Sequence, residues 1–310
     1  IKRKLVLKML YNNPMIKIKT IRYLFEAILG LKLLILSKIL GLKLSTKTFS
    51  WFFSNLGPKL KISNQAKDNL CLAFPGIKEA EIESIIFKMW ENIGMVAAEF
   101  FHLKKISEEK NNRISVSGEE HIKKYENNGV IFVSGHFANW EIIPLILRNY
   151  RSKVGGIYRH SNNFFVNSWV VKQRYNNTTP IQIRKGSSGA REMLSLLKEN
   201  GAVAMLVDQK LSSGVKVNFF GSEAMTSDGA ATLAIKYNYP VVPINVERTQ
   251  GSNFNVRFYP EIKINKTSDK QNDIRIFTSE INKFLEECIT SKPESWFWLH
   301  NRWDKKFNLN

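Results

Sequence analysis

The sequence predicts an α/β fold with a mixed, largely parallel sheet flanked by helices, and three observations support this prediction. From Gly129 onward, short apolar runs of strand character alternate with helical patterns. The connections between these runs are short, as expected for right-handed crossovers between parallel strands. Residues 240–264 contain two further strand patterns around a Gly-Ser-Asn turn, which predict an antiparallel pair.

The alternating elements can be assigned in chain order. Strands are expected at residues 129–134, 153–159, 181–185 and 202–208, and helices at 141–150, 162–175, 189–201 and 268–294. The region from residue 50 to residue 105 is expected to form helices that precede the α/β part. In its second half, Ile82, Ile85, Ile86 and Met89 recur at helical spacing after the Pro-Gly turn of "AFPGI".

Length and charge limit the classes of function. The chain has 310 residues, is 44% hydrophobic and contains no low-complexity tract, so it can bury a sizeable core in one globular domain. Its 46 Lys and Arg against 27 Asp and Glu give a net charge of +19, which favours acidic partners such as anionic lipid, nucleic acid or an acidic carrier protein. Cys71 and Cys288 lack metal-type spacing, and we expect both to be reduced and buried.

The amino-terminal region predicts contact with a membrane. Residues 1–19 are basic, and the segment from Tyr23 to Leu44 is rich in Leu and Ile but interrupted by Glu26 and three lysines. A helix lying in the membrane interface fits this pattern best, because lysine stems can reach outward while leucines enter the acyl region. A membrane-spanning helix and a buried core helix are the two alternatives. We therefore divide the chain into a basic, apolar, membrane-associated segment at 1–50 and a catalytic domain at 51–310.

The stretch "SGHFANWE" is the candidate catalytic motif. It follows the strand predicted at 129–134, and side chains just beyond the carboxyl ends of parallel strands gather where α/β proteins bind ligands. His136 can accept a proton from a hydroxyl near neutral pH if a carboxylate fixes its tautomer, and Glu141 is the nearest candidate in the sequence. The alternative for such a pair is a surface histidine and an unrelated glutamate at a helix start.

Several blocks resemble the lipid A late acyltransferases, within the acyltransferase superfamily that carries a His-x4-Asp/Glu motif. "SGHFANWE" is similar to that motif, and four more blocks follow in the family's order: "GIYRHSNNFFVNSW", "GAVAMLVDQK", "VNFFGSEAMTSDGAATLA" and "WFWLHNRWD". The helical lead-in "NLCLAFPGIKEAEIESIIFKMWENIGMVAAEF" is also similar, so the resemblance covers residues 19–305. One departure is Asn301, which stands where the family more often has arginine.

The resemblance implies an acyltransferase in which His136 is the general base and Glu141 orients its ring. It implies an acyl donor carried by acyl carrier protein, a lipid A precursor as acceptor and no cofactor. Arg159 is expected to bind a phosphate, and Asp208 to pair with Arg159 or orient it. Asn163 and Thr226 are further substrate-binding candidates carried by the resemblance alone.

The expected setting is the inner membrane, with the catalytic domain facing the cytoplasm. The positive charge is densest beside the apolar amino-terminal segment, which favours a lipid surface over nucleic acid as partner. The other histidines show no zinc-ligand spacing, so no metal is expected. Two alternatives are an acyltransferase for another glycolipid or glycerolipid, such as phosphatidylinositol mannoside, and a non-catalytic basic protein that binds membranes.

Overall fold

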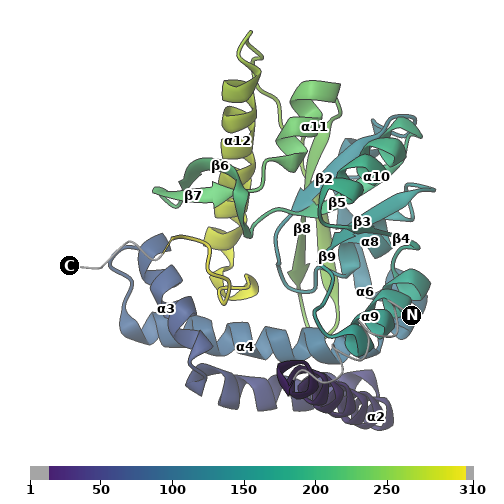
Figure 1. Cartoon of the computed structure of the whole chain (residues 1–310), viewed down its shortest axis with the longest axis vertical. Helices are drawn as coiled ribbons and strands as arrows, with labels where there is room; N and C mark the ends of the chain where they lie inside the picture. The colour runs from purple at the N-terminus through teal and green to yellow at the C-terminus, as the bar shows by residue number, and fades with distance from the viewer. Residues whose placement is uncertain (1–13, 305–310) are drawn as a thin grey trace.

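The computed structural model describes residues 14–304. The first thirteen residues, which make up most of the basic start at 1–19, lie outside the described part of the chain. Within the described part, a seven-stranded sheet in the order β1-β9-β8-β2-β5-β3-β4 forms the centre of the molecule (Figure 1). A separate antiparallel pair comprises β6 (Lys210–Phe219) and β7 (Ser222–Thr226).

The main sheet is mixed, as the sequence predicts. Its strands are β1 (Ile114–Ser117), β2 (Val130–Ser134), β3 (Val154–Tyr158), β4 (Ile181–Arg184), β5 (Ala202–Leu206), β8 (Val241–Arg248) and β9 (Phe254–Phe258). β8 and β9 run antiparallel, and the other neighbouring pairs are parallel. All five residues of β2 are buried, which identifies it as the central strand and explains its uninterrupted apolar run.

Helices cover both faces of this sheet. The longer helices are α2 (Pro14–Leu56), α3 (Ile62–Ala73), α4 (Glu79–Phe101), α9 (Phe164–Asn177), α10 (Ser187–Lys198), α11 (Gly229–Tyr237) and α12 (Lys270–Ser291). The shorter ones are α5 (Leu103–Glu108), α6 (Lys110–Arg113), α7 (Glu120–Lys123) and α8 (Ile142–Leu147), with 3-10 turns η1 (Gly57–Lys59) and η2 (Pro293–Ser295). α2 and α4 pack along each other across one end of the sheet (Figure 1).

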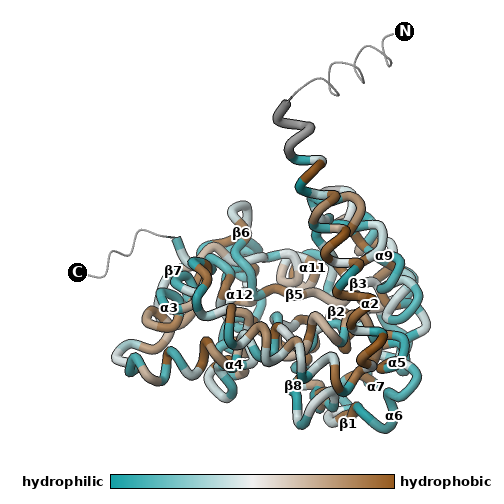
Figure 2. The backbone as a smooth tube through the Cα atoms, turned by 90° about the horizontal axis from the view of Figure 1, so that it is seen from below, coloured by the Kyte–Doolittle hydropathy of each residue, from teal (hydrophilic) through white to brown (hydrophobic). Residues whose placement is uncertain are grey.

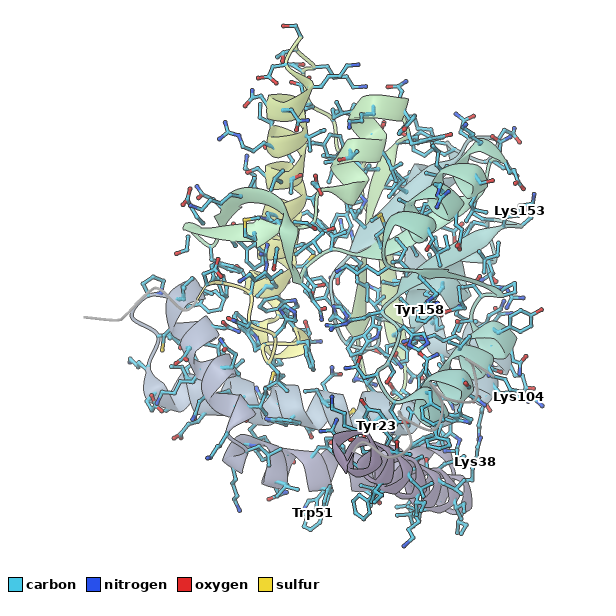
Figure 3. All side chains as sticks on the ribbon, in the orientation of Figure 1. Tyr23, Lys38, Trp51, Lys104, Lys153 and Tyr158 are labelled. Atoms are coloured by element: carbon cyan, nitrogen blue, oxygen red, sulfur yellow. The ribbon has the colours of Figure 1, made fainter. Side chains whose placement is uncertain are left out.

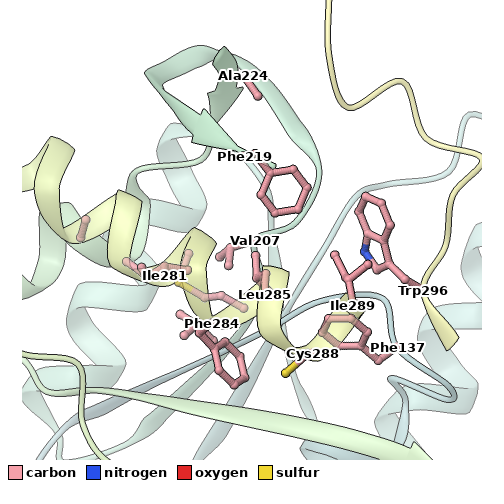
Figure 4. Packing of buried hydrophobic residues seen from close by; sticks show 14 of the residues in the cluster. Phe137, Val207, Phe219, Ala224, Ile281, Phe284, Leu285, Cys288, Ile289 and Trp296 are labelled. Carbon is pink, nitrogen blue, oxygen red and sulfur yellow. The ribbon is translucent and has the colours of Figure 1, made fainter. Parts of the chain in front are cut away.

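The core is split into two clusters because successive strand residues point to opposite faces. Ile131 and Val133 of β2 pack with α4, α11 and α12 on one face, whereas Val130 and Phe132 pack with α8 on the other. Figure 4 shows part of the first cluster, where Leu285 and Ile289 of α12 lie close to the aromatic rings. Cys288 is buried in this cluster, whereas Cys71 is only half-buried, so the expectation of two buried cysteines is half right.

α2 forms one helical element with a break at Gly41, whose φ of 68° and ψ of 171° are not helical. Large apolar side chains lie exposed along its outer side, and the tube in Figure 2 is brown over much of this helix. The most exposed are Ile21, Phe25, Ile39 and Trp51. In the part of the chain that the structure covers, every helix falls short of the combined length and apolarity that a membrane crossing requires.

The sequence misses several short elements of the fold, among them α6, α7, β1, the β6–β7 hairpin and α11. β1 has only four residues, so its period-two pattern is too short to stand out. The β6–β7 hairpin contains polar exposed positions and packs against α12, and α11 is a nine-residue helix in "GAATLAIKY". The predicted strands and helices between residues 129 and 208 all form, with ends within a few residues of the predicted ones.

Candidate active site

Two parallel strands bring a histidine and an aspartate together. Ser134 and Leu206, the last residues of β2 and β5, are paired in register. His136 and Asp208 each follow two residues later, so both lie beyond the carboxyl edge of the sheet. The His136 Nδ1 lies 2.8 Å from Asp208 Oδ1, and the backbone N–H of His136 donates to Asp208 Oδ2 at 2.9 Å.

Asp208 is buried and carries three hydrogen bonds on its carboxyl group. The third comes from the indole Nε1 of Trp296, at 2.8 Å. Burial opposes ionisation, but the charge of His136 and these hydrogen bonds outweigh it and lower the pKa of Asp208 from 3.8 to about 2. An ionised Asp208 can only accept, so Nδ1 of His136 carries a hydrogen, and in the neutral ring Nε2 has a free electron pair.

Glu141 does not orient His136, and the pairing expected from the sequence is wrong. Both oxygens of Glu141 accept hydrogen bonds from Arg174 on α9, with the Nε of Arg174 at 3.1 Å and 3.0 Å from Oε1 and Oε2. Burial opposes the charge on Arg174, but the carboxylate of Glu141 raises the pKa of the guanidinium. The physical reason lies in the loop, because Glu141 sits at the start of α8 facing α9 whereas His136 faces β5.

A cavity of about 330 Å³ opens in front of His136. Its walls include Trp140, Glu141, Arg159 and Arg174. The side chain of His136 is 18% exposed, so a substrate can reach its ring. The carboxyl ends of β2, β3 and β5 thus surround one pocket with a base, an acid and two arginines.

A second, apolar cavity of about 650 Å³ lies next to the first, between α2, α4 and α9. Trp140, Glu141 and Arg174 line both cavities, so these three side chains form the partition between them. The remaining walls are mainly apolar, including Leu34 of α2 and Phe100 of α4. Figure 3 labels Tyr158 at the end of β3 and Tyr23 on α2.

The remaining predicted residues are dispersed. Arg159 lines the cavity in front of His136 and is exposed. Asp208 bonds to His136 and Trp296, so the expected pairing of Asp208 with Arg159 is wrong. Asn163 caps α9 through the backbone N–H groups of Phe165 and Val166.

Asn163 also donates from Nδ2 to Tyr23 O and Glu26 Oε2 on α2, at 2.9 Å each, and so ties α9 to that helix. Thr226 is fully buried, where its hydroxyl donates to Ala224 O and accepts from Arg302 at 2.8 Å. Both predicted substrate-binding side chains are therefore occupied by contacts within the protein.

Two residues of the site are not recognisable in the sequence. Arg174 lies in the helical run "VVKQRY", where an arginine is indistinguishable from a solvent-facing one. Trp296 opens the block "WFWLHNRWD", so the sequence indicates its presence but not its bond to Asp208. Among residues 14–304, no three His, Cys, Asp or Glu side chains are grouped so as to hold a metal ion.

This fold and this geometry suit the class of α/β enzymes in which a histidine removes a proton from an attacking hydroxyl. The chain belongs to the bacterial lipid A biosynthesis acyltransferase family, whose model matches residues 15–305. It is therefore an acyltransferase.

Curated relatives agree with this family. The chain is 27% identical over 245 residues to the lipid A biosynthesis lauroyltransferase of Escherichia coli, covering 76% of both chains. It is 25% identical over 260 residues to a lipid A biosynthesis acyltransferase of Haemophilus influenzae, covering 82% of this chain and 81% of that protein. A phosphatidylinositol mannoside acyltransferase of Mycolicibacterium smegmatis is 23% identical over 189 residues, or 56% of this chain and 57% of that protein.

A solved structure is also similar, that of the 1-acyl-sn-glycerophosphate acyltransferase of Thermotoga maritima. Its TM-score is 0.40 at 13% identity, with 82% of this chain and 98% of that chain covered.

Proposed function

We propose that this protein transfers a fatty acyl group from acyl carrier protein to a hydroxyl of a lipid A precursor, forming an acyloxyacyl ester. The acceptor follows from the names of the curated relatives, which act in lipid A biosynthesis. One observation carries the chemistry: the His136–Asp208 pair faces a cavity lined by charged, polar and apolar side chains, and this cavity shares a wall with a large apolar cavity. Such a pair of spaces suits a reaction that joins a polar hydroxyl to a long hydrocarbon chain.

His136 acts as the general base. Its Nε2 takes the proton of the acceptor hydroxyl as the oxygen bonds to the thioester carbonyl carbon. The carbon–sulfur bond then breaks, and the proton on His136 returns to the departing sulfur. Asp208 holds the ring in the required tautomer and balances the positive charge that develops on it, a contribution of about 10²–10⁴ in rate for the base.

Arg174 is the natural source of positive charge near the developing oxyanion. It lines the cavity that contains His136, and Glu141 fixes its guanidinium through two oxygens. A fixed cation at such a position stabilises the transition state more than the ground state, and removal of one such donor typically costs about 10²–10³ in kcat. In this proposal, Glu141 of the His-x4-Glu motif acts on the arginine and Asp208 acts on the histidine.

The apolar cavity receives the acyl chain of the donor. Its volume of about 650 Å³ falls within the range of about 300–1,000 Å³ typical of small-molecule sites. Its walls contain few polar groups, as burial of a hydrocarbon requires. Because Trp140, Glu141 and Arg174 divide this cavity from the catalytic one, the thioester carbonyl would lie at that partition.

Arg159 binds a phosphate of the acceptor or of the donor arm. It is exposed at the rim of the cavity, and a guanidinium matches the geometry of a phosphate. Asn163 and Thr226 take no part in substrate binding in this proposal, because their hydrogen-bonding groups serve α9 and Arg302.

The protein works at the inner membrane with its catalytic domain on the cytoplasmic side. The exposed apolar side of α2 would lie in the lipid interface, and its lysines would meet anionic headgroups. Figure 3 shows Lys38 and Trp51 along this helix at the margin of the molecule. The net charge of +19 also favours encounter with acidic acyl carrier protein.

The decisive experiment measures transfer of a labelled acyl group from acyl carrier protein to a lipid A precursor with free 3-hydroxyacyl chains. His136→Ala should lower kcat by about 10²–10⁴. His121→Ala provides a matched control, because His121 lies on α7 away from both cavities. Absence of transfer by the wild type, with transfer to a phosphatidylinositol mannoside acceptor instead, would refute the lipid A assignment.

A further inference from the structure

The loop that presents His136 adopts a backbone conformation that needs support. Ala138 has a φ of 43°, in the left-handed region that residues with a Cβ rarely occupy. Such a conformation costs free energy and persists only where contacts with the surrounding structure hold it. The contacts of the loop from Gly135 to Glu141 therefore indicate what keeps the base in place.

A buried ion pair lies directly behind this loop. Glu99 of α4 is completely buried, and its carboxylate accepts from both terminal nitrogens of Arg248 on β8, with Nη2 at 2.9 Å. Asn139, which is also completely buried, donates from Nδ2 to Glu99 Oε2 at 2.8 Å. The other end of the same amide accepts from the backbone N–H of Glu141 at 3.1 Å.

The left-handed residue is held from two further sides. Asn92 of α4 donates from Nδ2 to Ala138 O at 3.0 Å, and its own oxygen accepts from Arg248 Nε at 3.0 Å. The N–H of Ala138 donates to Ser295 O at 2.9 Å. Phe137 forms an isolated bridge with Trp296, and Figure 4 shows these two rings flanking Ile289.

We propose that Glu99, Arg248, Asn139 and Asn92 form a positioning unit, the buried brace, that fixes the loop between His136 and Glu141. None of the four lines the catalytic cavity. They act through the backbone, because the brace holds the carbonyl of Ala138 and the N–H of Glu141 while Asp208 holds the N–H of His136. His136 lies at one end of the loop and the Glu141–Arg174 pair at the other. By fixing the loop, the brace sets the distance between them. This inference rests on the proposed acyl transfer for its kinetic consequence.

The charge on Glu99 is needed to satisfy three donors at once. Arg248 offers two nitrogens and Asn139 one, and two carboxylate oxygens accept all three. In Glu99→Gln, one oxygen becomes an NH₂ group that faces a donor at either position, so the hydrogen-bond set that supports the loop loses at least one contact. In Asn139→Asp, two carboxylates face each other with only Arg248 between them.

The test is a kinetic comparison of these two variants with their combination. Each single variant should lower kcat by about 10²-fold, since small misplacements of catalytic groups have effects of this size, and leave the KM for the acyl donor within about twofold. The double variant Glu99→Gln/Asn139→Asp again pairs a donor with an acceptor, because the introduced amide can donate to the introduced carboxylate, and it leaves the net charge unchanged. It should recover most of the lost kcat.

A matched control separates positioning from stability. Asp273 is buried at the first turn of α12 and accepts from Thr267 N and Oγ1 at 2.9 Å each. It lies at the opposite end of that 22-residue helix from the Ser295–Trp296 segment that supports the loop. Asp273→Asn should lower the thermal midpoint of unfolding about as much as Glu99→Gln does, yet leave kcat unchanged. Asn92→Ala, at a half-buried position, is a milder variant in case Glu99→Gln does not fold.

Hydrogen–deuterium exchange supplies a readout that does not depend on turnover. Amide exchange in a peptide spanning residues 135–142 should rise at least about 10-fold in Glu99→Gln and stay unchanged in Asp273→Asn. Unchanged exchange and kcat in Glu99→Gln and Asn139→Asp would overturn the brace. An inactive wild type with increased loop exchange in the variants would instead refute the proposed acyl transfer and support the brace.

Discussion

At the scale of single residues, the site depends on which carboxylate meets which cation. Asp208 is buried beside His136, and Glu141 is buried beside Arg174. Each buried acid is thus paired, as the cost of burying an isolated charge requires. In the proposed function the two pairs have separate tasks, one orienting the base and the other fixing a cation at the partition between the cavities.

Asp208 makes stability depend on acidic pH. Its pKa of about 2 in the folded protein lies below the ordinary value of 3.8, so its stabilising contribution is complete above pH 4 to 5 and is lost as the pH falls toward 2. A shift of this size corresponds to about 2 kcal/mol. The thermal midpoint of the wild type should therefore fall more steeply between pH 5 and pH 3 than that of Asp208→Asn. Parallel curves for the two proteins would contradict this assignment.

At the scale of elements, α2 contributes to both the apolar cavity and the surface. Its inner side supplies Ala27, Gly30, Leu31 and Leu34 to the apolar cavity, and its outer side exposes large apolar residues. The same helix would therefore touch lipid on one side and the acyl chain on the other. Asn163 ties this helix to α9, which carries Arg174.

Gly30 should control acyl chain length. It lines the apolar cavity, and a Cβ built on it meets nothing within 4 Å, so a larger side chain can project into the cavity. Gly30→Phe should shift the preference toward shorter donors. Each methylene left unburied costs about 0.8 kcal/mol, so loss of two corresponds to roughly 10-fold in kcat/KM.

The measurement for Gly30 is kcat/KM across donors of increasing chain length. Leu29→Phe is the control, because Leu29 is exposed on the same helix and does not line the cavity. Folding should not suffer, since glycine in a helix interior is about 1 kcal/mol less favourable than alanine. The same chain-length preference in Gly30→Phe as in the wild type would place the acyl chain elsewhere.

The outer side of α2 should govern membrane binding. Ile39 and Trp51 are 78% and 68% exposed, so substituting both by Glu changes no core contact. Loss of two inserted side chains should weaken binding to anionic vesicles by at least about 10-fold, given about 1.5–3 kcal/mol per large apolar side chain. Ile276→Glu on α12 is the control at an exposed apolar residue away from α2. Co-sedimentation unaffected by the double substitution would assign membrane contact to another surface.

At the scale of the whole molecule, one core cluster joins the helices, the main sheet and the segment that follows α12. α4, α12, Phe137, Trp296 and Trp298 all contribute to it, and Figure 4 shows Phe137 and Trp296 beside residues of α12. The Trp296 that packs here also donates to Asp208, so the carboxylate that holds His136 is attached to the core. Global unfolding and loss of the site should therefore coincide.

Cys288 reports on this core. Burial raises the pKa of its thiol to about 12, so at pH 8 only about 1 molecule in 10⁴ carries the thiolate. A soluble thiol reagent should therefore modify half-buried Cys71 first and reach Cys288 only on unfolding. Rapid modification of both thiols in the folded protein would show that the cluster opens locally. Cys71→Ser leaves Cys288 as the only thiol and makes the assignment direct.

The sequence by itself determined the alternation of strands and helices from Gly129, the position of His136 and the family blocks. These features depend on local patterns, because strand and helix periodicity and the strand-end position of a motif can be read along the chain. It also placed Arg159 and Asp208 at the carboxyl ends of predicted strands, at the sheet edge where His136 lies. The sequence did not identify Arg174, because no neighbouring residue distinguishes it from an ordinary solvent-facing arginine on a helix.

Only the tertiary structure decided which residues are partners. The strand order places β5 beside β2, in a register that aligns Ser134 with Leu206 and so delivers Asp208 to His136. The left-handed turn at Ala138 directs Glu141 toward α9, where it meets Arg174. The physical reason is that strand order and the direction of a loop are set by packing between segments far apart in the chain, which no local pattern encodes.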